Sequence, residues 1–262
     1  MSYNFFAYLS RMRYISRWSL MRNAISENIQ EHSHQVAVLA HALGVIRRDV
    51  FGVDCDPEEY AAVALYHDSS EILTGDLPTP IKYHSAEIRE AYAQVEQLAC
   101  DKLLDTLPES LRGAFGEVMT GETAARCHDL VKAADKLSAY IKCIEERKTG
   151  NDEFRSAEKQ TRAVLEQSEL PEVAYFLEHF IPAFERTLDE LGTIESSERH
   201  GIEHEESIQG TAVSRLRRAA ALCGGLRRAA GRGAPRRNAG AHAARPSLGR
   251  RRVRGLRGDL RA

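Results

Sequence analysis

Apolar residues recur every three to four positions through most of the first 190 residues, which is the spacing of amphipathic helices. The predicted helices cover residues 4–16, about 28–48, 56–75, 85–106, a shorter segment after Pro108, then 122–148, 153–167 and 171–191. We find no segment with the alternating polar and apolar positions of a half-buried strand. The sequence therefore predicts an all-α domain that ends near residue 192.

Residues that start and stop helices support these boundaries. Asn28 precedes Glu31 by three positions, which is the spacing of a capping box. Asp56 is followed by proline and two acids, a strong helix start. Gly150 is placed to close the long helix, and Pro182 is expected to interrupt or kink the last one.

Composition and charge change beyond this domain. Residues 193–210 are polar and acidic, as in a linker, and residues 211–262 contain 15 Arg, no Lys and one acid, a formal charge of +14. Residues 1–210 contain 21 Lys and Arg against 37 Asp and Glu, a formal charge of −16. The tail has almost no large apolar residues, so it cannot offset its ordering entropy and is predicted to be disordered.

The tail allows three interpretations. Its exclusive use of Arg, together with abundant Ala and Gly, resembles GC-rich DNA read in an unselected frame, which indicates a frameshifted or extended terminus. A functional basic tail is an equal alternative. The third interpretation is a nucleic-acid-binding arm. Its positive charge would attract phosphates, but it lacks aromatic residues for stacking on bases.

Several features favour a cytoplasmic protein. No run of 18 or more apolar residues is present, so no membrane span is expected. Residues 1–9 lack the pattern of a signal peptide. The five cysteines contain no C-x-x-C pair, which is typical of reduced thiols rather than of disulfides or a Cys-zinc site.

The candidate chemistry is concentrated in residues 66–80, which read Y-H-D-S-S-E-I-L-T-G-D-L-P-T-P. His67 and Asp68 are adjacent there, Glu71 follows one helical turn later, and Asp76 comes just after a glycine. An apolar helix leads into this stretch. Ionisable groups at the end of such a helix are costly unless a metal or a substrate pairs with them.

Two other predicted helices contribute similar residues. His32 lies in the first turns of the helix over 28–48, and Asp135 lies among apolar positions of the helix over 122–148. Two imidazoles and two carboxylates form a mixed nitrogen and oxygen site suited to a divalent transition metal with room for water. Any one of these residues alone is better explained as a satisfied core polar group. The set of four favours a metal site.

The remaining histidines near these motifs are expected to lie outside the site. His34 is two positions from His32 on one helix, so its side chain points about 200° away. His41 lies further along the same helix. His84 and His128 are near the chemical motifs but belong to none of them.

Five motifs together resemble one family. In chain order they are F-F-A-Y-L-S-R at 5–11, R-W-S-L-M-R-N at 17–23, E-N-I-Q-E-H-S at 27–33, Y-H-D-S-S-E-I-L-T-G-D-L-P-T-P-I-K-Y at 66–83 and V-K-A-A-D-K-L-S-A-Y-I-K-C-I-E-E at 131–146. The sequence is similar to the HD-domain metal-dependent phosphohydrolases, and within them to the bacterial 5′-deoxynucleotidases. The resemblance covers about residues 3–192 and leaves the tail without a counterpart.

The resemblance implies a helical HD-domain bundle with one divalent metal ion such as Co, Mn or Cu. The H…HD…D ligands of the family match His32, His67, Asp68 and Asp135. Glu71 matches the catalytic carboxylate that positions or deprotonates the attacking water. The resemblance also implies a homodimer.

The resemblance further implies how a substrate is held. Arg17 matches a residue that binds phosphate, and Trp18 one on the sugar side. Asp76 matches an acid near the 3′ side of the deoxyribose that disfavours a 2′-hydroxyl. The expected activity is hydrolysis of deoxyribonucleoside 5′-monophosphates to deoxynucleoside and phosphate. Alternatives are an HD phosphohydrolase acting on dNTPs, cyclic nucleotides or guanosine polyphosphates, and a nucleic-acid-binding protein acting through its tail.

Overall fold

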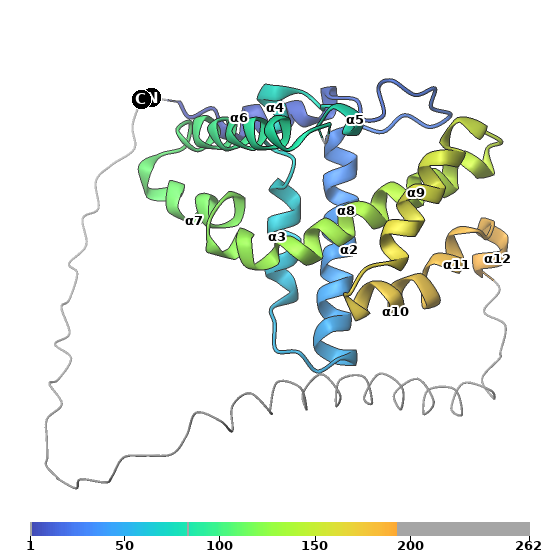
Figure 1. Ribbon diagram of the computed structural model, residues 1–262. Helices are drawn as coiled ribbons and strands as arrows, with labels where there is room; N and C mark the ends of the chain where they lie inside the picture. Colours follow the sequence, from blue (N-terminus) through green and yellow to red (C-terminus); the bar gives the residue numbers. More distant parts are fainter. Residues whose placement is uncertain (1, 83, 193–262) are drawn as a thin grey trace, which may run out of the picture. The chain divides into compact units, whose positions relative to one another are not determined.

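The computed structural model describes residues 2–82 and 84–192, which fold as helices joined by short turns (Figure 1). The α-helices are α1 (Phe5–Leu9), α2 (Ile29–Val45), α3 (Pro57–Tyr66), α4 (Glu71–Thr74), α5 (Thr79–Lys82), α6 (Ala86–Leu104), α7 (Glu109–Met119), α8 (Glu122–Lys148), α9 (Arg155–Glu166), α10 (Pro171–His179), α11 (Ile181–Phe184) and α12 (Leu188–Gly192). Two short 3₁₀ helices, η1 (Ser10–Tyr14) and η3 (Asp152–Phe154), and one π-helical segment, η2 (Ile46–Val50), are also present. Within these residues, β-type pairing is limited to one isolated bridge, between Ser16 and Asn28. The predicted all-α fold is confirmed.

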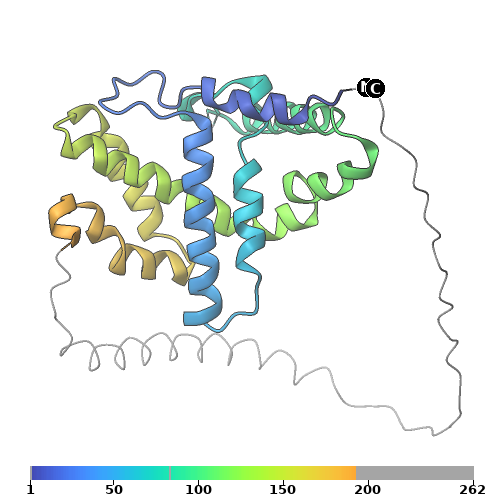
Figure 2. The ribbon, with the colours of Figure 1, turned by 180° about the vertical axis from the view of Figure 1, so that it is seen from behind.

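The main core lies where α2, α3 and α8 pack together. Figures 1 and 2 show α2 and α3 side by side, with α8 crossing them. Leu43 of α2 and Leu137 of α8 are fully buried, and Val63 of α3 is nearly so. Each such side chain contributes about 1.5–3 kcal/mol when it is buried. This packing stabilises the fold and fixes the turns of α2 and α8 that carry His32 and Asp135.

A second apolar cluster joins α1, α6 and α7. Phe5 and Leu103 are buried at its centre, and the ring of Phe5 contacts that of Phe115 edge-on with centroids 5.0 Å apart. Ile72 of α4 packs against this cluster. The short α4 is therefore held by tertiary packing, and Glu71 begins it.

The predicted start and stop signals act as expected. The side chain of Asn28 accepts hydrogen bonds from the N–H groups of Gln30 and Glu31, and the Glu31 carboxylate accepts one from the N–H of Asn28. Asp56 caps α3 by accepting one hydrogen bond from the N–H of Glu58 at 3.1 Å. Gly150 has a φ of +85°, a left-handed conformation that favours glycine after a helix.

The single helix predicted over residues 56–75 was wrong. α3 ends at Tyr66, and residues 67–70 form tight turns before α4 begins. The Ala64 carbonyl, which a continued helix would offer to the N–H of Asp68, accepts a hydrogen bond from Nδ1 of His67 at 2.7 Å. The two serines that follow also favour turns over helix. The break places His67 and Glu71 in separate elements, so Glu71 does not lie one turn beyond His67 on a continuous helix.

The last predicted helix, over residues 171–191, is divided in three. α10 ends at His179, α11 covers Ile181–Phe184, and α12 begins at Leu188. The first interruption is at Phe180, because Pro182 has no N–H to donate to the carbonyl of Glu178 and is tolerated only in the first turn of the new helix α11. The predicted interruption near Pro182 is confirmed, and the second break was not predicted.

Residues 15–28, here called the Arg17 loop, are docked on the C-terminal half of α8. Glu146 is fully buried and accepts hydrogen bonds from the backbone N–H groups of Ala24 and Ile25 at 2.8 and 3.0 Å. Lys142, also buried, donates to Glu146 at 2.5 Å and to the carbonyl of Ile25. A buried ion pair on α8 thus anchors a loop more than 115 residues earlier in the chain.

The predictions for the linker and the tail concern residues that the structure does not describe. The linker over residues 193–210 and the Arg-rich tail over 211–262 lie outside the described residues. Among the helices that are described, none has the length and hydropathy needed to cross a membrane.

Candidate metal centre and substrate site

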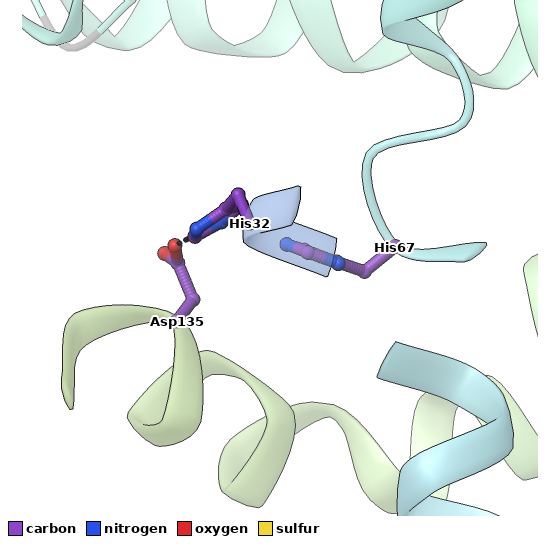
Figure 3. Close-up of side chains that lie close together, drawn as sticks. All are labelled: His32, His67 and Asp135. Carbon is purple, nitrogen blue, oxygen red and sulfur yellow. Dashed lines mark ion pairs between the residues drawn. The ribbon is translucent and has the colours of Figure 1, made fainter. Parts of the chain in front are cut away.

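Three parts of the chain bring the predicted metal ligands together. His32 comes from the first turn of α2, His67 and Asp68 from the turn after α3, and Asp135 from the middle of α8. Donor atoms of His32, His67 and Asp135 all lie within 4.8 Å of one another (Figure 3). Oδ2 of Asp68 lies outside that group, yet it is 3.5 Å from Nε2 of His32 and 3.2 Å from Nε2 of His67.

Both imidazoles are oriented by hydrogen bonds at Nδ1. His67 must donate through Nδ1, because its partner is the Ala64 carbonyl, which can only accept. Nδ1 of His32 lies 3.1 Å from the hydroxyl of Ser138, which itself donates to Oε1 of Gln35 at 2.7 Å. The Ser138 oxygen is therefore left to accept from His32. In each neutral ring the lone pair lies on Nε2, the atom that faces the carboxylates.

These atoms fit a divalent cation. Nε2 of His32 and Nε2 of His67 are buried and have no hydrogen-bond partner among the described residues. Oδ1 of Asp135 is 3.2 Å from Nε2 of His32. Two nitrogen lone pairs and two carboxylates facing one small space suit a transition metal with mixed ligands. Hydrogen bonds at the other ring nitrogen, as found here, are usual for histidines that bind metal.

The charges at this cluster are strongly coupled. Burial lowers the pKa of His32, which keeps that ring neutral. Burial also disfavours a charged His67, but the carboxylates of Asp68 and Asp135 outweigh it and raise the pKa of His67 to about 9. Burial likewise opposes charge on Asp68, and His67 nevertheless holds its pKa at about 2. A metal therefore competes with a proton on His67.

Glu71 is the first residue of α4 and is almost fully buried. Its Oε2 has no hydrogen-bond partner among the described residues. Burial, followed by the nearby charges of Asp68 and Asp76, raises the pKa of Glu71 to about 9. Burial also raises the pKa of Asp76, against the effect of Arg17. Both predicted carboxylates thus belong to one electrostatic cluster with the metal ligands.

The Arg17 loop brings Arg17 to this cluster, and Trp18 follows it in the chain. The guanidinium of Arg17 is 3.4 Å from Oδ2 of Asp68. Burial disfavours its charge, but Asp135, Asp68 and Glu27 raise the pKa of Arg17 above its ordinary value. Trp18 is half-buried, has a φ of +55°, and packs its indole against the ring of Phe154 at 5.3 Å between centroids.

Comparison with known proteins identifies the family. A family model described as 5′-deoxynucleotidase YfbR-like matches residues 4–184. The chain belongs to this family. A 5′-deoxynucleotidase of Vibrio cholerae is 50% identical over 189 residues, covering 72% of this chain and 97% of the relative. The 5′-deoxynucleotidase YfbR of Shigella boydii is 47% identical over 189 residues, covering 72% and 95%.

The YfbR-like assignment agrees with the fold. An HD-domain phosphohydrolase of Listeria innocua is similar in structure with a TM-score of 0.61 at 25% identity, covering 69% of this chain and 88% of that one. The predicted membership of the HD-domain phosphohydrolases, and within them of the 5′-deoxynucleotidases, is confirmed. The matches extend over nearly the whole length of the relatives, whereas they cover under three quarters of this chain.

In this YfbR-like chain, the four histidines that were predicted to lie outside the site are all exposed: His34, His41, His84 and His128. His34 shares α2 with the buried His32 and faces the other way, as the helical spacing predicts.

Sequence reasoning missed two groups that support the site. Ser138 orients His32, and Glu27 accepts hydrogen bonds from both Arg17 and Trp18. Each lies inside a recognised motif, and Ser138 follows Asp135 by three positions, so the two share a face of α8. That spacing was the available signal for Ser138. No sequence signal distinguished Glu27 from other acids near the start of α2.

Proposed function

We infer that this protein is a metal-dependent 5′-deoxynucleotidase, which hydrolyses deoxyribonucleoside 5′-monophosphates to deoxynucleoside and phosphate. The observation that supports it most is the convergence of His32, His67, Asp68 and Asp135 beside a buried arginine, in a chain of the YfbR-like family. Two 5′-deoxynucleotidases are 50% and 47% identical to it over 189 residues.

In this proposal four side chains hold one divalent metal: His32, His67, Asp68 and Asp135. Such a cation supplies positive charge to a phosphate oxygen and lowers the pKa of a nearby water. Its identity is proposed as Co, Mn, Cu or a similar transition metal, because imidazole and carboxylate together suit that group. The unpartnered Nε2 atoms of His32 and His67 support this role.

The remaining residues bind the substrate and activate the attacking water. Arg17 donates to the phosphate, since its planar guanidinium matches phosphate oxygens and stays charged. Glu71, whose pKa of about 9 would be lowered by a cation held at the neighbouring ligands, would accept a proton from the attacking water as an ionised carboxylate. The water oxygen forms a bond to phosphorus as the bond to the 5′ oxygen breaks. The 5′ oxygen takes up the proton that Glu71 accepted and leaves as the 5′-hydroxyl. Trp18 packs against the sugar side, and Asp76 disfavours a 2′-hydroxyl by its position near the 3′ side.

We also propose that the protein is a cytoplasmic homodimer. The homodimer is proposed because the family resemblance implies it. The four cysteines of the described residues, Cys55, Cys100, Cys127 and Cys143, are free thiols, which are typical of a reducing compartment.

Phosphate release from a substrate panel tests the proposed function. Full-length protein loaded with Mn²⁺ or Co²⁺ is expected to release phosphate from deoxynucleoside 5′-monophosphates, and much less from ribonucleoside monophosphates. Nucleoside triphosphates, cyclic nucleotides and guanosine polyphosphates serve as the competing substrates. Release of no phosphate from any deoxynucleoside monophosphate would overturn the assignment, and preference for a competing substrate would replace it with that activity.

A further inference from the structure

Glu27 is the residue that the two predicted substrate contacts share. Its Oε2 atom accepts a hydrogen bond from Nε of Arg17 at 3.1 Å and another from Nε1 of Trp18 at 3.1 Å. The side chains of Glu27 and Arg17 are only 13% and 14% exposed, so this interaction is largely shielded from water. One carboxylate oxygen therefore fixes two neighbouring side chains of different chemistry.

The backbone around Glu27 reinforces this arrangement. The N–H of Arg17 donates to the Glu27 carbonyl at 3.0 Å, and the bridge between Ser16 and Asn28 lies directly beside it. Trp18 has a φ of +55°, a left-handed conformation that is unfavourable for a large side chain. A strained residue persists only where its surroundings hold it, and such strain is concentrated at functional sites. The carboxylate of Glu27 is one of the groups that hold it.

The hydrogen bonds also decide which atoms of Arg17 and Trp18 face a ligand. Nε of Arg17 is occupied by Glu27, which leaves Nη1 on the side of Asp68, 3.4 Å from Oδ2. The single donor of the Trp18 indole is likewise used by Glu27, so the ring has only its apolar surface left for a ligand.

We propose that Glu27 is a positioning residue that holds the guanidinium of Arg17 and the indole of Trp18 in the geometry that receives the phosphate and sugar of the substrate. The proposal rests on the proposed function and extends it to a residue outside the predicted site. Glu27 acts through Arg17 and Trp18 and is not itself expected to contact the substrate.

The test compares Glu27→Ala and Glu27→Gln with wild-type full-length protein, and with Glu90→Gln as a control at an exposed carboxylate of α6. For a deoxynucleoside monophosphate, Glu27→Ala is expected to lower kcat/KM by roughly 10–100-fold, because small misplacement of binding groups is costly. Glu27→Gln keeps an acceptor oxygen at the same reach and should recover part of the loss. Glu90→Gln should match wild type.

Two readouts separate positioning from a general structural defect. Trp18 is the only tryptophan of the chain, so its fluorescence emission reports the indole directly and should change in Glu27→Ala. The affinity for Mn²⁺, measured by titration calorimetry, should stay at the wild-type value. Wild-type kcat/KM and emission in Glu27→Ala would overturn the proposal, and so would a parallel loss of Mn²⁺ affinity.

A double-mutant cycle tests whether Glu27 acts through Arg17. In an Arg17→Ala background, adding Glu27→Ala should lower kcat/KM by a smaller factor than in wild type, because only its hydrogen bond to Trp18 is still lost, whereas an equal loss in both backgrounds would contradict the proposal. If wild-type protein releases no phosphate, the proposed function fails separately. Trp18 emission and the dissociation constant for inorganic phosphate then still test Glu27, and wild-type values of both in Glu27→Ala would overturn its role.

Discussion

At the scale of single residues, hydrogen bonds decide which atoms of the site are left to react. His32 and His67 each use Nδ1 within the protein, so Nε2 is free to bind a cation. The sequence could separate His32 from His34, because two positions on a helix differ by about 200°. It could not show that Ser138, 106 residues away, orients His32, because that contact exists only after α8 packs on α2.

Substitution of Glu71 should lower the reaction rate without removing the metal. Glu71→Gln and Glu71→Ala are expected to lower kcat by at least about 100-fold, since they remove the group that accepts the proton from water. Metal content, measured by mass spectrometry of the purified protein, should stay near wild type. Asp135→Asn is the contrasting variant and should lose metal together with activity. Loss of metal from the Glu71 variants to the same degree would make Glu71 a ligand.

At the scale of elements, the Arg17 loop depends on a distant part of the chain. It has no helix of its own, and its backbone is held by the buried Lys142–Glu146 pair of α8. Local features such as the cap at Asn28 could be predicted from the sequence. This anchor could not, because an i, i+4 pair of opposite charges usually indicates an exposed helix face.

The pH dependence of stability should reveal the Glu146 anchor. Burial opposes charge on Glu146, but hydrogen bonds from Lys142 and from backbone N–H groups lower its pKa from 4.5 to about 2. A depressed carboxyl pKa stabilises the fold above pH 4.5, and this contribution is lost as the pH falls towards 2.

Glu146→Gln is therefore expected to lower the free energy of unfolding at pH 7 by at least about 3 kcal/mol, because it also leaves Lys142 buried without its partner. The difference from wild type should shrink between pH 5 and pH 3, as measured by urea unfolding. The exposed neighbour Glu145 provides the control, since Glu145→Gln should change stability by less than about 0.5 kcal/mol. A difference that is equal at both pH values would contradict the role given to Glu146.

At the scale of the whole domain, the proposed metal site lies where separate parts of the chain meet. α2 and α8 supply His32 and Asp135, and the turn after α3 supplies His67 and Asp68. A cation bound there links all three and binds only the folded state, so it adds stability through mass action. Removal of the metal should therefore lower the free energy of unfolding of the domain.

Metal removal tests this coupling. At a metal concentration 100 times the dissociation constant, binding contributes about 2.7 kcal/mol, and a chelator should lower Tm by roughly 5–10 °C in scanning calorimetry. His32→Ala should abolish the effect of the chelator. His34→Ala, an exposed histidine of the same helix, should keep it. A Tm of metal-loaded wild-type protein that does not respond to chelator would contradict a metal site between these elements.

The helical class, the long helices with their caps, and the family whose motifs contain the predicted ligands could all be predicted from the sequence. These features are local, because apolar periodicity and capping depend on residues a few positions apart. Three other features depend on tertiary packing: the end of α3 at Tyr66, the support of the site by Ser138 and Glu27, and the anchoring of the Arg17 loop by Glu146. The turn after α3 involves the His67 side chain, and Ser138 and Glu146 act between segments more than 100 residues apart.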